Sequence, residues 1–171
     1  MVRVGCLAVA LLAPILLASA TPATYDNEHT WIAGDLSYPF PKNAVLGGVS
    51  TQGYYVYVGR VKYEGVFPVQ LRAEIGQINW HNGTYYYIGT KNYDILVPSA
   101  GSSFEWITSH DGKFERGLVA VGTNLNDERV FVCRAITPYG QLPGTLILSL
   151  KACSVSGTKV RYDKYEVLVD K

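Results

Sequence analysis

The stretch YVYVGR at residues 55–60 returns as RVFVCR at residues 129–134, and each copy ends in an arginine. The flanking landmarks recur in the same order: a Trp-Ile pair, a glycine, a proline-containing turn and a closing hydrophobic strand. In the first copy these are Trp31-Ile32, Gly48, Pro68 and residues 93–97, and in the second Trp106-Ile107, Gly122, Pro143 and residues 165–169. A period of about 74 residues is longer than a solenoid repeat, so the sequence indicates two copies of one small module.

This repeat sets the expected domain boundaries. We place the first copy at residues 31–97 and the second at residues 106–171, joined by a short linker of small residues at 98–105. Residues 21–30 are polar and lack periodicity, so we expect a flexible lead-in there. Because the linker is short, the two halves must touch, and their outward edges are expected to pair rather than stay exposed. A strand exchanged between the halves would satisfy those edges.

The local sequence pattern is that of strands in both copies. Segments such as 54–58, 129–132 and 145–150 are rich in β-branched and aromatic residues and are separated by Gly, Pro, Asn and Asp. No stretch after the first twenty residues shows apolar residues at helical spacing for three turns. We therefore predict an all-β fold in which two tandem repeats form a pseudo-two-fold antiparallel β-sandwich or barrel.

Residues 1–20 have the pattern of a cleaved secretory signal peptide. Arg3 gives a short positive start, and the apolar run at 7–17 is too short to span a bilayer comfortably. Small residues at 18–20 occupy the positions that a signal peptidase reads. We expect a secreted, extracellular chain rather than one held by an uncleaved anchor, and no membrane insertion. The 15 basic residues nearly balance the 14 acidic ones, which gives no electrostatic reason to expect a nucleic-acid partner.

Signal cleavage would also remove Cys6 and leave Cys133 and Cys153 in a compartment that permits disulfides. A bridge between them would close a loop of about 20 residues and contribute about 3 kcal/mol in the chain-entropy model. The alternative is a pair of small buried apolar residues in neighbouring strands. Only the geometry can decide between the two interpretations.

Asn82-Gly83-Thr84 is an N-glycosylation acceptor in a secreted chain. Gly83 suits the tip of a hairpin between polar and aromatic strands, which would leave Asn82 accessible. Such short motifs also arise by chance, so Asn82 is a candidate glycosylation site.

The second copy resembles the DM9 repeat, a family also catalogued as DUF3421. The resemblance depends on the Trp-Ile opening at Trp106, the glycine, the arginine-ended strand, the Leu-Pro-Gly turn at 142–144 and the closing Tyr-Glu-Val-Leu at 165–168. The first copy keeps the same landmarks more loosely, so the resemblance covers nearly all of the chain after residue 30. It implies an all-β module that occurs in tandem, and some members of the family are mannose-binding lectins that act in pattern recognition.

The resemblance also implies where a sugar would bind. In the lectins the sugar is held by an acidic residue two places after the glycine and by a lysine just after the proline-containing turn. The equivalent positions here are Ser50 and Gln70 in the first copy, and Asn124 and Thr145 in the second. These four residues are the candidate ligand-binding residues. They can still hydrogen-bond a hydroxyl, but they lack the charge that makes such bonds about twice as strong.

The sequence holds no constellation typical of catalysis. Its three histidines, His29, His81 and His110, are not at metal-ligand spacing, and no cysteine pair has a zinc spacing. No nucleophile elbow, phosphate loop or dinucleotide fingerprint is present. We expect no enzyme activity, no catalytic residue, no metal and no cofactor. Arg60 and Arg134 have two interpretations: donors that face a ligand, or, as we favour, guanidinium groups that tie their strand ends to carbonyls or a carboxylate.

Together these features favour a secreted binding protein that recognises a glycan or a microbial surface, in the manner of an innate-immunity lectin. The expected sites are a pair, one around Ser50 and Gln70 and one around Asn124 and Thr145. One alternative is a secreted protein-interaction or structural module that has lost the sugar site. Another is a component of a toxin, venom or effector, by analogy with the natterins.

Overall fold

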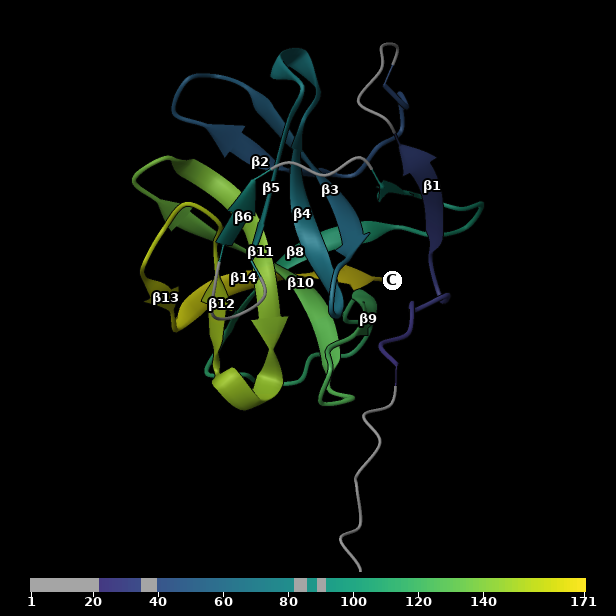
Figure 1. Ribbon diagram of the computed structural model, residues 1–171, viewed down its shortest axis with the longest axis vertical. Coiled ribbons are helices and arrows are strands. Elements are labelled where there is room, and N and C mark those ends of the chain that lie inside the picture. The colour runs from purple at the N-terminus through teal and green to yellow at the C-terminus, as the bar shows by residue number, and fades with distance from the viewer. Residues whose placement is uncertain (1–21, 35–39, 82–85, 89–91) are drawn as a thin grey trace, which may run out of the picture.

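The computed structural model describes residues 22–34, 40–81, 86–88 and 92–171. Over these residues the chain forms fourteen strands and two short 3-10 turns, with no α-helix (Figure 1). The expected all-β fold is thereby confirmed. Two predictions, the signal peptide at 1–20 and the glycosylation site at Asn82, lie outside the described residues. Within the described part, no helix is long and apolar enough to cross a bilayer.

The elements of the first half recur in the same order in the second. The first half contains β1 (Thr30–Gly34), β2 (Leu46–Ser50), β3 (Tyr55–Lys62), β4 (Val66–Arg72), η1 (Ala73–Ile75), β5 (Gln77–His81), β6 (Tyr86–Ile88) and β7 (Tyr93–Val97). The second half contains β8 (Phe104–His110), β9 (Ala120–Thr123), β10 (Arg129–Thr137), β11 (Gly140–Ile147), η2 (Leu148–Leu150), β12 (Ala152–Ser154), β13 (Arg161–Tyr162) and β14 (Lys164–Asp170). Strands β1 to β7 thus correspond, in order, to strands β8 to β14.

The strand pairings repeat as well, and all of them are antiparallel. In the first half β3 pairs with β2, β4 and β7, while β1 pairs with β7 and β5 with both β4 and β6. In the second half β10, β8 and β12 make the equivalent pairs. The strands form one curled sheet, a half-barrel, rather than two separate sheets of a sandwich (Figure 1).

The halves join through the edge strands, as the short linker predicts. Strand β2 pairs with β11, with Val49 opposite Gln141 and Ser50 opposite Gly140. The equivalent contact on the other side is a single bridge between Gly65 and Asn124. Among the described residues the closing strands are not exchanged: β7 and β14 each pair within their own half.

Two apolar clusters form the core, and each is shared between the halves. The first is built mainly from the first half but includes Val121, Val132 and Leu168 from the second. The second is built mainly from the second half but includes Val56 from the first. Because each half completes the other's core, separating them would expose buried surface on both, at roughly 25 cal/mol for every Å² of apolar area.

Cys133 and Cys153 form a disulfide between β10 and β12, with their Cα atoms 6.0 Å apart. Both residues are fully buried, so the bridge lies inside the second apolar cluster. The equivalent positions in the first half, on β3 and β5, are Gly59 and Ile78. The cross-link therefore belongs to the second half alone, where it contributes about 3 kcal/mol in the chain-entropy model.

The described part of the segment before β1, residues 22–29, is paired with the second half, whereas a flexible lead-in was expected at residues 21–30. Tyr25 bridges to Gly122, and the amide of Asp26 donates to the carbonyl of Val121 at 3.1 Å. These partners lie on β9, almost 100 residues away in sequence, so a local sequence pattern could not predict these contacts. The linker also ends earlier than expected, since β8 begins at Phe104.

Candidate functional site

The four candidate ligand-binding residues are all buried, each at most 8% exposed: Ser50, Gln70, Asn124 and Thr145. Ser50 ends β2 and Asn124 follows β9, whereas Gln70 lies in β4 and Thr145 in β11. None of them is an open, projecting side chain. Their hydrogen bonds show what each one does instead.

Ser50 and Asn124 hold the turns that follow their strands. The Ser50 hydroxyl accepts a hydrogen bond from the amide of Tyr54 at 3.2 Å. The Asn124 side-chain oxygen accepts from the amides of Asn126 at 2.9 Å and Glu128 at 3.0 Å, and its Nδ2 donates to the Glu128 carboxylate at 3.1 Å. Short polar side chains stabilise tight turns in this way. The polar residue two places after the glycine of each copy is thus explained by its role in the local turn.

Gln70 and Thr145 connect the two halves. The Gln70 Nε2 donates to the Pro143 carbonyl at 2.9 Å, and the Thr145 hydroxyl donates to the His81 carbonyl. Each residue therefore donates from its own half to a backbone oxygen of the other. The Gln70 Oε1 has no partner among the described residues. These two positions support the interface between the halves, and both side chains are almost fully buried there.

A pocket of about 210 Å³ lies where the two halves meet, close to this interface. The first half supplies Ser50, Thr51, Gln52, Arg72 and Asn79, and the second supplies Tyr139, Leu142, Ser156 and Gly157. Of the four candidates, Ser50 lines the pocket, while Gln70 is paired with Asn79 in the adjacent strand. The volume is below the roughly 300–1,000 Å³ typical of sites for drug-sized molecules. It suits one small ring or one unit of a longer chain.

Arg72 gives this pocket its charge. Its Nη1 donates to the Gln77 side-chain oxygen at 2.6 Å, and none of the recorded ion pairs of the described residues includes it. Burial lowers the pKa of the guanidinium below its usual value, because the charged form loses solvation. None of the described residues that line the pocket is acidic.

Several polar atoms in the pocket wall have unused hydrogen-bonding capacity. The Arg72 Nε, the Asn79 Oδ1 and the Ser156 Oγ are buried and have no partner among the described residues. Leaving a buried polar group unpaired costs about 1–3 kcal/mol, so water or ligand oxygens are expected to satisfy these atoms. Sequence reasoning missed all three residues. A comparison of the copies for differences would have found Arg72, because its equivalent at the end of β11 is Ile147.

Arg60 and Arg134 have the structural role that we favoured. The Arg60 Nε donates to Asp94 at 2.9 Å, and the Arg134 Nε donates to Glu166 at 2.7 Å. Each guanidinium also donates to a carbonyl of the other half, Arg60 to Val121 and Arg134 to Gly47. Each lies over the ring of its own half's opening tryptophan. The recurring arginines therefore join strand ends and halves.

His81 ends β5 and is buried beside the interface between the halves. Burial, followed by the charge of Arg161, lowers the pKa of His81 from 6.5 to about 4. The unfolded chain therefore binds a proton between pH 6.5 and 4 that the folded chain does not bind, and stability falls as the pH drops through this window. We expect urea midpoints to fall more steeply between pH 7 and 4 in the wild type than in His81→Gln. Equal pH dependence in both proteins would contradict this assignment.

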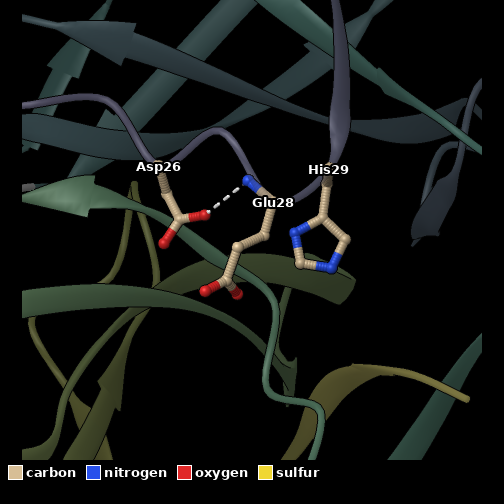
Figure 2. Close-up of side chains that lie close together, drawn as sticks. All are labelled: Asp26, Glu28 and His29. Atoms are coloured by element: carbon tan, nitrogen blue, oxygen red, sulfur yellow. Dashed lines mark hydrogen bonds between the residues drawn. The ribbon is translucent and has the colours of Figure 1, made fainter.

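One cluster has the composition of a metal site. Asp26, Glu28 and His29 offer one ligand atom each, and these atoms all lie within 4.8 Å of one another. Figure 2 shows the three side chains close together. However, the Arg129 Nη2 lies 2.7 Å from an Asp26 carboxylate oxygen and 3.4 Å from one of Glu28. The His29 Nε2 lies 3.7 Å from a carboxylate oxygen of Asp170. Because Arg129 already pairs with both carboxylates, we assign the cluster to anchoring the N-terminal segment.

Comparison with known families agrees with this architecture. Residues 67–161, more than half of the chain, match the family model described as the DM9 repeat. The matched range begins in β4 and ends in β13, so it crosses from the first half to the second and includes Arg72, Asn79, Tyr139 and Ser156. No match was found among the curated proteins.

Proposed function

Because the chain belongs to the DM9 repeat family, we propose that it is a secreted, non-enzymatic protein that binds a glycan in the pocket between its halves. The family is associated with the recognition of carbohydrates and microbes. The observation that carries the proposal is the wall of this pocket, which contains amide, hydroxyl and guanidinium groups whose hydrogen bonds are incomplete. Sugars are recognised by such groups, since each hydroxyl can both donate and accept.

Tyr139 adds an aromatic surface to the pocket. The residue is about half exposed and lies at the turn between β10 and β11, so its ring is available at the rim. An aromatic ring packs well against the apolar face of a sugar and loses little conformational entropy when it does so. The combination of an aromatic rim and a polar wall supports binding of one sugar unit.

The pocket supports binding better than catalysis. The described residues that line it contain no carboxylate, imidazole or thiol. General acid–base catalysis mostly uses such groups, and a serine or threonine nucleophile needs an adjacent base to activate it. Arg72 can bind and orient a ligand, but its guanidinium does not exchange protons at neutral pH.

Two observations support an extracellular location. The first is the signal-like pattern at residues 1–20. The second is the buried disulfide between Cys133 and Cys153, since stable disulfides form mainly in oxidising compartments. Glycosylation at Asn82 would fit the same location.

The decisive experiment is a glycan array probed with the full secreted chain, followed by titration of the strongest ligands. We expect Tyr139→Ala to weaken binding about two- to tenfold, in line with the roughly 0.5–1.5 kcal/mol of an aromatic contact. Tyr55→Ala is the matched control, because Tyr55 is similarly exposed but does not line the pocket. An array without any binding, or equal losses in both variants, would overturn the proposal.

A protein-interaction module is the second candidate, and one surface favours it. Ile136 is 81% exposed and lies beside a hollow of about 380 Å³ that is also lined by Arg134, Gln141 and Glu166. An exposed aliphatic side chain next to fixed charges is typical of a protein contact. If this is the functional surface, the glycan array stays empty, and a purified secreted partner binds the wild type but not Ile136→Asp.

A further inference from the structure

We propose that the pocket between the halves selects a sugar that carries a carboxylate, and that Arg72 holds this carboxylate. The inference deepens the proposed function and rests on it, since it names the ligand class of the same pocket. It is argued from the surroundings of Arg72, from the free face of its guanidinium and from the difference between the two halves.

Arg72 differs from the other well-fixed arginines of the fold. Arg60, Arg129 and Arg134 are each ion-paired with a carboxylate of the chain, at 2.7 to 2.9 Å. Among the described residues, Arg72 has only the neutral side chain of Gln77 as its hydrogen-bond partner. A partly buried cation without a counter-charge is costly, and an anion that enters the pocket would offset this cost.

The orientation of the guanidinium favours a carboxylate. Gln77 occupies Nη1, which leaves Nε and Nη2 for a second partner, and Nε has no partner in the described structure. Two adjacent N–H groups match the two oxygens of a carboxylate and form parallel, charge-assisted hydrogen bonds. Lysine would offer the same charge without this planar fork.

The rest of the pocket wall suits the remainder of a sugar. The Asn79 Oδ1 can accept a hydrogen bond from a hydroxyl, and the Ser156 hydroxyl can donate or accept one. Ser156 is 96% buried, so its unpartnered hydroxyl is held in place rather than solvated. A molecule with one carboxylate and neighbouring hydroxyls on a small ring, such as a uronic acid, matches these groups.

The other half does not reproduce this site. The position equivalent to Arg72 is Ile147, since each is the last residue of its strand and pairs with the first residue of the next. The position equivalent to Tyr139, just before the glycine of the turn, is Glu64. An aliphatic residue thus stands in place of the cation, and a carboxylate in place of the tyrosine, so these positions do not favour an anion. We therefore expect one acidic-sugar site per chain, in place of the two like sites expected from the sequence.

The test compares methyl β-glucuronide with methyl β-glucoside, which differ only in having a carboxylate or a hydroxymethyl group at the same carbon. In titrations of the full secreted chain we expect the glucuronide to bind at least about tenfold more tightly, because charge-assisted hydrogen bonds are about twice as strong as neutral ones. Arg72→Gln should abolish this preference and leave glucoside binding within about twofold. Arg72→Lys should keep part of it. Arg116→Gln, an exposed arginine outside the pocket, is the matched control.

The outcomes separate the two levels of the proposal. If no glycan binds at all, the proposed function fails. If both glycosides bind equally and Arg72→Gln changes neither, only the acidic-sugar inference fails. Tighter binding of glucose 6-phosphate than of the glucuronide would overturn the choice of a carboxylate over other anions. If Arg72→Gln does not fold, NMR of the wild type decides the question, because the Arg72 Nε–H resonance must shift with the glucuronide and not with the glucoside.

Discussion

Replacing Arg60 with methionine is expected to lower the free energy of unfolding by about 3 kcal/mol, the lower end of the range for breaking a buried ion pair. Arg60 is only 6% exposed and connects four segments of the chain. It pairs with Asp94 on β7 and donates to the carbonyls of Asp26, before β1, and Val121, on β9. The substitution leaves one carboxylate uncompensated, removes the Arg60 donor from the Asp26 carbonyl and leaves the Val121 carbonyl with the amide of Asp26 alone. Partial exposure of Asp94 places the loss at the lower end of the range.

Arg134→Met provides the matched comparison, because Arg134 occupies the equivalent place in the second half. Its side chain is more exposed, at 17%, and its contact with the Gly47 carbonyl is long, at 3.4 Å. We expect a loss of about 1–2 kcal/mol there, as for a partly solvated charged hydrogen bond. Urea unfolding followed by tryptophan fluorescence measures both values. A larger loss at Arg134 than at Arg60 would contradict the expected order and the weight given to the contacts of Arg60 with the N-terminal segment.

The repeat made much of the fold predictable, because a pattern that occurs twice constrains the structure twice. The two arginine-ended stretches became β3 and β10, and the closing stretches became β7 and β14, which pair with them. The role of Arg60 and Arg134 was also predictable, since an acidic residue recurs at an equivalent position in each closing strand. Short-range alternation and spacing determine these features.

The candidate site was harder to predict, because it depends on differences between the copies. Matching equivalent positions of the two copies led to Ser50 and Asn124, whose polar side chains stabilise the turns that follow their strands. Arg72 becomes a candidate only when it is compared with Ile147, the residue at the equivalent position in the second copy. The pairing of the N-terminal segment was not predicted for a related reason. Tyr25 and Asp26 bond to residues almost 100 positions away in the sequence.

Gly48→Ala tests the joint between the halves on which the pocket depends. A Cβ at Gly48 would overlap the backbone carbonyl of Gln141, a group that cannot move without opening the pairing of β2 with β11. We expect a loss of about 3 kcal/mol or more, at the upper end for inserting a methyl group into a packed interior.

The same substitution should also weaken glycan binding in the fraction that remains folded. Ser50 and Tyr139 line the pocket from the two sides of this joint, and the amide of Thr51 donates to the Tyr139 carbonyl at 2.9 Å. Val49→Ala is the control, because Val49 is adjacent but exposed, and its loss should stay below about 1 kcal/mol. Urea unfolding and a glycan titration of both variants provide the measurements. If Gly48→Ala unfolds at the wild-type midpoint, the halves do not approach as closely as the structure places them, and the pocket between them loses its basis.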